Sequence, residues 1–286
     1  MTAAYISAMR GHRVTLFDQR SKLGGQINLA VKIPGKQEFY ETLRFYRVML
    51  EKYGVELKLG QCVNQDTIVA GNYDAVVLAT GVRPRELELE GADHAKVLSY
   101  LDVLDKECPV GNKVAVIGAG GIGIDVAHFL TAQTPYSGDV PEYLQGYGIL
   151  DSEKALALRK PKKREVTVFQ RSTDKIGKRL GKTTGWAHIQ TLKSHGVQLL
   201  PGATYLKIDD SGLHVKVALK KGEEPQEIVM DVDNVIVAAG QEPRRELETS
   251  LRESGFEVHV IGGARQTLGL DAKTAINDAA ELAAKF

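Results

Sequence analysis

Apolar residues recur along the chain with two spacings, and these predict an alternation of helices and strands. Between 37 and 53 they return every three to four residues, which predicts a helix with one face toward a core. Between 74 and 81 they form an almost continuous run, typical of a strand in a parallel sheet covered on both faces. Further strands are predicted at 14–18, 55–59, 165–172 and 257–264, and further helices at 3–9, 184–195 and 271–284.

Two stretches depart from this alternation. The segments at 197–208, 212–219 and 226–238 are rich in strand-forming residues, and within them YLKIDD, LHVKVAL and EIVMDV are typical of a small antiparallel meander. Residues 134–163 carry several prolines and glycines and lead into a basic run that ends at Arg164, so we expect a mobile insertion there.

An internal repeat indicates two nucleotide-binding domains of one design. DAVVLATG at 74–81 is echoed by DNVIVAAG at 233–240, and each is followed by a Pro-Arg pair. Aligning the first helix with the helix after residue 123 matches Ala4 with Ala127. In this register Met1 falls one residue after the third glycine of the second domain's turn. We therefore expect the first domain to lack its initial strand and its glycine loop.

The second domain carries that glycine turn between a predicted strand and a predicted helix. In GAGGIG, Gly118 permits the tight turn, Gly120 lets a pyrophosphate approach the backbone, and Gly123 packs the helix on the strand. Gly121 stands where the helix begins, and a helix N-terminus favours phosphate charge. The strand and helix context favours nucleotide binding over a merely structural turn.

The end of the next strand predicts which nucleotide is bound. An acidic residue there would accept hydrogen bonds from the ribose of NAD, but the chain offers Gln170 and Arg171. Lys175, Lys178 and Arg179 follow closely. A cation in place of a carboxylate favours a 2′-phosphate, and hence NADPH over NADH. The alternative is a solvated basic loop.

In the first domain, several turn residues are candidates for contact with FAD. Asp18 ends its strand where the adenosine ribose would be recognised, and the turn at 23–26 would run past the flavin. The alternative is that these are ordinary surface turns. The predicted FAD residues are Asp18, Gly24, Gly25, Gln26, Thr80, Gly81, Gly262 and Gly263, with the helix near Asp271 facing a flavin oxygen.

The composition mainly excludes some classes of partner and of functional site. The 37 basic residues nearly balance the 36 acidic ones, which argues against nucleic acid as a partner, and no long apolar run or leader predicts a membrane segment or secretion. We therefore expect a cytoplasmic protein. Cys62 and Cys108 form no C-x-x-C pair and are too few for an iron–sulfur cluster. GKRLGKTTG at 177–185 is one residue short of an ATPase phosphate loop. The pattern assigns no metal site and no catalytic side chain.

Several less generic strings carry a family resemblance. They include LGGQ at 23–26, IPGKQEFYETLR at 33–44, KVLSYLDVL at 96–104 and LGKTTGW at 180–186. Together with the glycine turn, they resemble the C-terminal half of bacterial NADPH-dependent 2,4-dienoyl-CoA reductases, within the wider family of trimethylamine dehydrogenase and other old-yellow-enzyme fusions. Gly263 departs from many related flavoproteins, which carry an acidic residue there.

The resemblance implies an α/β protein with two Rossmann-like domains of the pyridine nucleotide-disulfide reductase type. An FAD domain at 1–107 and 242–286 would enclose an NADPH domain at 108–241. NADPH would reduce FAD here, and electrons would pass through a [4Fe-4S] cluster to FMN in a preceding TIM barrel, where the dienoyl-CoA of fatty acid β-oxidation is reduced. The barrel, FMN and the cluster are expected only outside this chain.

Two alternatives remain open at this point. The chain is an NADPH-binding module without flavin and without turnover, or it is a diaphorase-like reductase that passes electrons to a separate partner.

Overall fold

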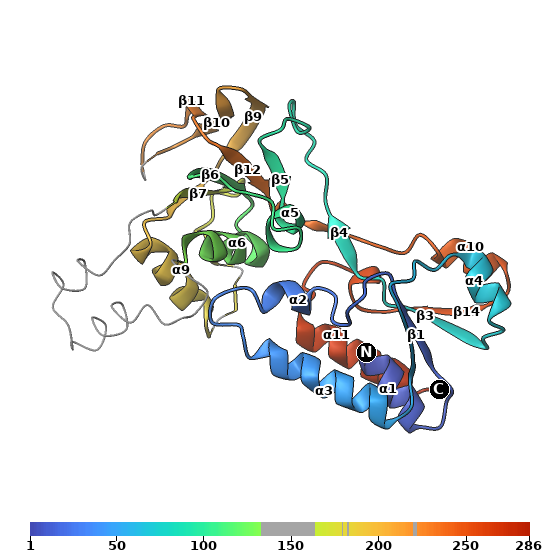
Figure 1. Ribbon diagram of the computed structural model, residues 1–286. Coiled ribbons are helices and arrows are strands. Elements are labelled where there is room, and N and C mark those ends of the chain that lie inside the picture. The colour runs from blue at the N-terminus through green and yellow to red at the C-terminus, as the bar shows by residue number, and fades with distance from the viewer. Residues whose placement is uncertain (133–163, 179, 182, 220–221) are drawn as a thin grey trace, which may run out of the picture. The chain divides into compact units, whose positions relative to one another are not determined.

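The computed structural model describes residues 1–132, 164–178, 180–181, 183–219 and 222–286 (Figure 1). The insertion predicted at 134–163 lies outside the described residues. The chain divides into two compact units: unit 1 comprises Met1–Val31, Glu38–Arg83 and Gln241–Phe286, and unit 2 comprises Lys32–Gln37 and Pro84–Gly240.

Unit 2 is built on a five-stranded parallel sheet, as the continuous apolar runs predicted. Its order is β5-β12-β6-β7-β8. The strands are β5 (Val97–Ser99), β6 (Lys113–Ile117), β7 (Glu165–Gln170), β8 (Gln198–Pro201) and β12 (Asn234–Val237). Because β5 pairs with β12, the stretch before residue 108 joins unit 2, whereas the sequence placed it in the first domain.

The two faces of this sheet are covered differently (Figure 1). Helices α5 (Tyr100–Leu104), α6 (Gly121–Thr131) and α9 (Gly185–Ser194) lie on one side. On the other side lies the predicted antiparallel meander of β9 (Thr204–Asp209), β10 (Gly212–Val217) and β11 (Gln226–Met230). The core between sheet and meander is formed by fully buried side chains that include Ile117, Phe169, Leu213 and Val215.

Unit 1 contains two separate parallel pairs of strands. One joins β1 (Thr15–Asp18) to β2 (Glu56–Leu59), and the other joins β3 (Ala75–Leu78) to β14 (Glu257–Val260). Strands β4 (Val82–Pro84) and β13 (Gln241–Pro243) form a further short pair, where the chain passes from one unit to the other. Each predicted strand of this unit is therefore present, although each is shorter than its apolar run.

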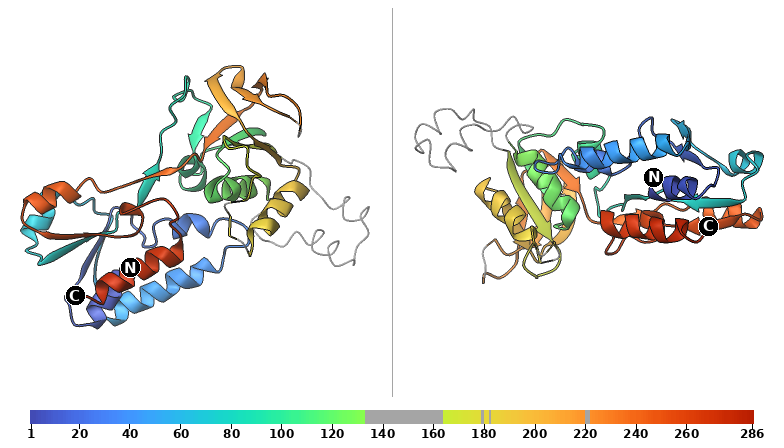
Figure 2. Two further views of the ribbon diagram at one scale, coloured as in Figure 1. Left: turned by 180° about the vertical axis from the view of Figure 1, so that it is seen from behind. Right: turned by 90° about the horizontal axis from the view of Figure 1, so that it is seen from below.

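The helices of unit 1 follow the predicted periodicity. Helix α1 (Thr2–Met9) packs against α3 (Phe39–Lys52) and α11 (Ala272–Ala283), which Figure 2 shows from two further directions. The shorter elements are α2 (Ile27–Ala30), α4 (Gln65–Ala70), α10 (Glu248–Glu253) and the 3-10 turn η1 (Gly262–Ala264). No helix in the described part of the chain combines the length and apolar composition needed to cross a bilayer.

Candidate nucleotide-binding sites

The glycine turn of unit 2 has the geometry that its sequence predicted. Strand β6 ends at Ile117, and Gly118 takes a φ of +111°, which residues other than glycine rarely adopt. A Cβ on Gly118 would lie 2.4 Å from the carbonyl oxygen of Ala238, and one on Gly123 would lie 1.8 Å from the oxygen of Gly118. These two glycines therefore allow strand, turn and helix to approach closely.

The two glycines between them have a different surrounding. Gly120 is the N-cap of α6 in an extended conformation, and Gly121 is the first helical residue. A Cβ at either position would meet no atom within 4 Å. The open space lies at a helix N-terminus, where unpaired N–H groups and the helix dipole attract an anion. The turn is thus shaped to receive a phosphate group.

The loop after β7 is organised by Gln170. Its side-chain amide donates to the carbonyl oxygens of Ser172 at 3.0 Å and Asp174 at 2.8 Å, which closes the loop upon itself. Arg171 is exposed beside it. Lys178 Nζ lies 2.8 Å from Asp174 Oδ1, in an exposed pair of the kind that contributes little free energy. Asp174 is a carboxylate in the predicted basic loop that sequence reasoning missed; Arg179 lies outside the described residues.

An ion pair between α6 and the segment before α3 was also not predicted from the sequence. Lys36 Nζ donates to both carboxylate oxygens of Asp125, at 2.7 and 2.6 Å, and the two side chains are only 26% and 23% exposed. Lys32 similarly pairs with Glu107 at 2.7 Å. These contacts hold the segment Lys32–Gln37 within unit 2, between stretches of unit 1. The sequence shows Lys36 only as part of a polar turn.

Several predicted FAD residues of unit 1 meet at the carboxyl ends of β3 and β14. A Cβ on Gly263 would lie 2.8 Å from Val82 Cγ1 and 3.3 Å from Gly81, so any side chain there would require Val82 to shift. The Thr80 hydroxyl donates to the carbonyl of Arg244, and Arg244 N–H donates to the carbonyl of Gly81 at 2.9 Å. Parallel strands leave their ends at one edge, which is where ligands bind in α/β folds.

The remaining predicted residues of unit 1 lie on other turns. Gly24 and Gly25 have φ values of +118° and +50°, and Gln26, the N-cap of α2, accepts a hydrogen bond from Gln241 at 3.3 Å. Asp18 ends β1 and accepts the Arg20 N–H at 2.9 Å. The strand β1 belongs to the other parallel pair, so Asp18 and the β3–β14 turns sit on separate sheets.

The N-terminus of α11 is already capped. Asp271 accepts the Thr274 N–H at 2.7 Å, and this hydrogen bond holds the pKa of the Asp271 carboxyl below its usual range. Further along the helix, Asp278 accepts the Gly262 N–H at 3.0 Å and pairs with Arg265 at 2.8 Å. Asp278 therefore fixes the turn that carries Gly262 and Gly263, a role that the alanine-rich sequence of α11 gave no sign of.

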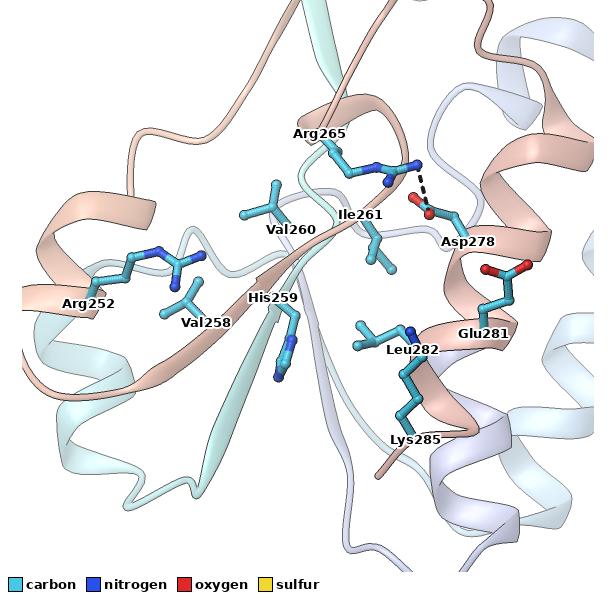
Figure 3. A pocket seen from close by; sticks show the side chains of 10 residues that line it. All are labelled: Arg252, Val258, His259, Val260, Ile261, Arg265, Asp278, Glu281, Leu282 and Lys285. Carbon is cyan, nitrogen blue, oxygen red and sulfur yellow. Dashed lines mark ion pairs between the residues drawn. The ribbon is translucent and has the colours of Figure 1, made fainter.

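One cavity of unit 1 lies away from these turns. It is an open pocket of about 360 Å³ between α10, β14 and α11, lined in part by Arg252, His259 and Lys285 (Figure 3). None of the residues predicted to bind a cofactor lines it. The sites of interest are therefore turns at strand ends rather than this pocket.

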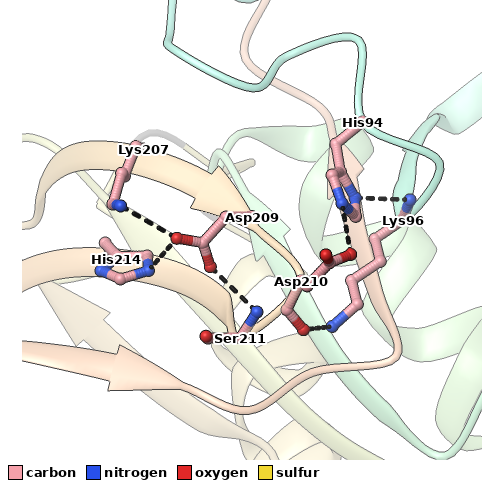
Figure 4. Close-up of polar contacts among 7 residues, drawn as sticks. All are labelled: His94, Lys96, Lys207, Asp209, Asp210, Ser211 and His214. Carbon is pink, nitrogen blue, oxygen red and sulfur yellow. Dashed lines mark hydrogen bonds and ion pairs between the residues drawn. The ribbon is translucent and has the colours of Figure 1, made fainter.

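A cluster of titratable groups at the β9–β10 turn has a structural explanation (Figure 4). Hydrogen bonds from Lys207 and His214 hold the pKa of Asp209 well below its usual range, and Asp209 also accepts the Ser211 N–H at 2.9 Å. His94 Nε2 lies 3.2 Å from Asp210 Oδ1, which ties the loop before β5 to this turn. Within the described residues, no group of three or more potential ligands is arranged to hold a metal ion.

Comparison with known proteins places these features in a wider context. The profile of a family described as pyridine nucleotide-disulphide oxidoreductase matches residues 1–267. A cinnamate reductase of Clostridium sporogenes is 29% identical over 93% of this chain and 35% of its own length, and an NADH oxidase of Thermoanaerobacter brockii is 28% identical over 92% and 36%.

A solved structure of a 2-naphthoyl-CoA reductase complex covers 100% of this chain and 38% of its own, with 26% identity and a TM-score of 0.81. This match confirms the predicted α/β fold. The chain spans little more than a third of the length of the curated relatives that it matches over most of its residues.

Proposed function

This chain belongs to the pyridine nucleotide-disulphide oxidoreductase family, and from that premise we propose that it is the module of a larger flavoenzyme that passes a hydride from NADPH to FAD. The observation that carries the proposal is the glycine turn of unit 2. Gly118 and Gly123 close the turn, while Gly120 and Gly121 leave open space at the N-terminus of α6. The protein's part in such a reaction is to bind and orient the two cofactors.

The preference for NADPH is supported by the loop after β7. The Gln170 side-chain amide donates to carbonyl oxygens of the same loop. Arg171 is exposed at the strand end, where a ribose 2′-phosphate would lie. Asp174, the one nearby carboxylate in the described loop, is paired with Lys178. A guanidinium suits the bidentate recognition of a phosphate.

The test is the substitution Arg171→Asp. We expect the affinity for NADPH to fall about a hundredfold, equivalent to ~2.7 kcal/mol, while the affinity for NADH changes much less. Lys216→Asp, which makes the same charge change at an exposed position of β10, is the control. Titration of both nucleotides by calorimetry gives the four values needed. Equal losses for NADPH and NADH in the Arg171 variant would contradict the assignment.

The FAD half of the proposal is supported by the turns of unit 1. Gly81 and Gly263 bring two backbone segments together at the ends of β3 and β14, and a Cβ on Gly25 would meet no atom within 4 Å. This is a backbone surface that a cofactor can approach closely. FAD held there would supply a two-electron acceptor for the hydride. Asp18, at the end of β1, would hold the adenosine ribose.

A second candidate function has its own supporting observation. Unit 1 has two separate two-stranded parallel pairs where unit 2 has one sheet of five strands. Among the described residues, unit 1 contains no counterpart of the glycine turn from Gly118 to Gly123. On that ground the chain alone would bind NADPH in unit 2 and hold no flavin. The visible spectrum of the purified chain separates the two: a flavin band bleached by NADPH supports the hydride-transfer module, and a colourless protein that still binds NADPH supports the binding module.

For the larger enzyme, we propose reduction of a 2,4-dienoyl-CoA, in a barrel domain in cis that carries FMN and a [4Fe-4S] cluster. The support is the family resemblance of LGKTTGW and KVLSYLDVL, together with a structural relative named for a CoA thioester. No residue of this chain is assigned to that step. NADPH-dependent reduction of a dye by this chain, without reduction of dienoyl-CoA, is the expected outcome; dienoyl-CoA reduction by residues 1–286 alone would contradict it.

A further inference from the structure

The turn between β8 and β9 is hydrogen-bonded to the loop that carries Arg171. The Ala203 N–H donates to the carbonyl oxygen of Gln170 at 2.9 Å, and the Gly202 N–H donates to that of Ser172 at 3.0 Å. Gln170 and Ser172 are the chain neighbours of Arg171, so the turn is fixed to the loop on both sides of this residue. The first residues of β9 therefore lie beside the strand end at which the ribose 2′-phosphate of NADPH is proposed to bind.

Tyr205, the second residue of β9, lies in this region. Its ring meets the ring of Phe169 edge to face, with centroids 6.3 Å apart. The side chain is half-buried and packs against the apolar core between sheet and meander. Phe169 is the residue before Gln170, at the end of β7. Tyr205 therefore connects the core of unit 2 to the loop after β7.

The hydroxyl group of Tyr205 is not explained by the packing of this core. Among the described residues it has no hydrogen-bond partner, and the guanidinium of Arg171 has none either. A phenylalanine would fill the same volume, and a hydroxyl withdrawn from water without a partner costs free energy. Burial raises the pKa of Tyr205, and the charge of the nearby Arg171 opposes this rise only in part. The hydroxyl is therefore a protonated donor at neutral pH.

Two donors without partners, close to each other at a strand end, suit an oxyanion. A guanidinium and a neutral phenol both donate to phosphate oxygens, and hydrogen bonds to a charged acceptor are stronger than those to a neutral one. NADH offers only an uncharged ribose hydroxyl at this position, so it gains less from the same two donors. The pair of Tyr205 and Arg171 would thus discriminate between the two nucleotides by charge.

We propose that Tyr205 is a specificity-determining residue for NADPH, whose hydroxyl donates a hydrogen bond to the ribose 2′-phosphate that Arg171 also binds. The inference rests on the proposed binding of NADPH by unit 2 and adds a residue that the glycine motif and the end of β7 do not include. It makes the meander a part of the nucleotide site as well as a cover for the sheet.

The test compares Tyr205→Phe with the parent chain in its affinity for NADPH and NADH, which differ only in the 2′-phosphate. A third ligand, 2′,5′-ADP, represents the adenosine end of NADPH alone. The control is Tyr73→Phe in unit 1, because Tyr73 is also half-buried and its ring meets that of Phe17 edge to face with centroids 6.2 Å apart. Calorimetry gives the affinities, and urea unfolding gives the free energy of unfolding of each variant.

We expect Tyr205→Phe to weaken the binding of NADPH and of 2′,5′-ADP about tenfold, because a hydrogen bond to a charged group is lost. The affinity for NADH should change less than about twofold. The free energy of unfolding should not fall, since the lost hydroxyl has no partner in the described part of the free protein. Tyr73→Phe should change none of the three affinities. An unchanged affinity for NADPH, or equal losses for NADPH and NADH, would overturn the proposal.

The same titrations separate this proposal from the proposed function. If Arg171→Asp removes the preference for NADPH while Tyr205→Phe leaves it intact, the binding of NADPH by unit 2 stands and Tyr205 has no part in it. If the parent chain binds NADPH no more tightly than NADH, the preference assigned to Arg171 and the role of Tyr205 are both wrong.

Discussion

At the level of single residues, glycines of the same turn are required for different physical reasons. Gly118 needs a positive φ and close contact with Ala238, whereas Gly120 has an ordinary φ and open space around it. The glycine pattern predicted both positions, because the motif implies a tight turn and a close approach by phosphate. It gave no information about the partners that fix the other turns, such as Asp278 for Gly262 and Asp174 for Lys178.

This contrast predicts opposite outcomes for two alanine substitutions. Gly118→Ala should lower the free energy of unfolding by about 3 kcal/mol, because the new Cβ meets the Ala238 carbonyl at an unfavourable φ. Gly120→Ala should cost less than about 1 kcal/mol of stability, yet weaken NADPH binding about tenfold or more by occupying the space before α6. Urea unfolding and nucleotide titration of both variants check this. A Gly118 variant as stable as the parent chain would contradict the steric role of Gly118. Unimpaired NADPH binding by the Gly120 variant would contradict the approach of the nucleotide at Gly120.

At the level of elements, three histidines lie where α6 packs against α9: His128 of α6, His188 in the first turn of α9 and His195 at its C-cap. The His128 ring lies 6.2 Å from that of His188 and 6.1 Å from that of His195, centroid to centroid. Burial, together with the smaller effect of the charges of His195, His188 and Lys36, lowers the pKa of His128 to about 4. The sequence showed scattered histidines; only the packing of one helix on another brings them together.

The consequence is a pH-dependent stability of unit 2. In the unfolded chain His128 titrates near 6.5, while in the folded chain it stays neutral down to about pH 4. The free energy of unfolding of unit 2 is therefore highest above about pH 6.5 and declines as the pH falls toward 4, because His128 binds a proton in the unfolded state but not in the folded state. Thermal melts at pH 7.5, 5.5 and 4.5 should show a smaller decline for His128→Gln than for the parent chain. His12→Gln, at an exposed position of unit 1, is the control, and an equal decline in all three proteins would argue against the cluster.

At the scale of the whole molecule, the two units share one chain that crosses between them several times. Each unit has its own apolar cores. A ligand that binds one unit stabilises that unit by mass action, by ~2.7 kcal/mol at a hundred times its dissociation constant.

We therefore expect NADPH to slow amide exchange selectively in unit 2. The protected strands should be β6, β7 and β12, which surround the glycine turn, while β1 and β3 of unit 1 exchange as before. Exchange measured with and without saturating NADPH provides the comparison. Equal protection of both units would mean that the nucleotide is bound by both or that they unfold as one.

The elements of the fold were largely predictable, because each depends on the local spacing of apolar residues. The helices α3, α9 and α11 begin and end within two residues of their predicted bounds, and the meander β9–β11 was expected from its alternation. The unit to which residues 84–107 belong was not predictable in this way, since it depends on the pairing of β5 with β12.

The class of the fold and the repeat of two related units could be predicted from the sequence, because they follow from periodicity, and the glycine pattern predicted the tight turn at Gly118. Only the tertiary contacts show that Lys36 pairs with Asp125, that a Cβ on Gly263 would press on Val82, and that among the described strands β1 pairs with β2 and β3 with β14. Such features join residues far apart in the chain, and the free energy of a contact depends on which neighbour the fold brings within reach.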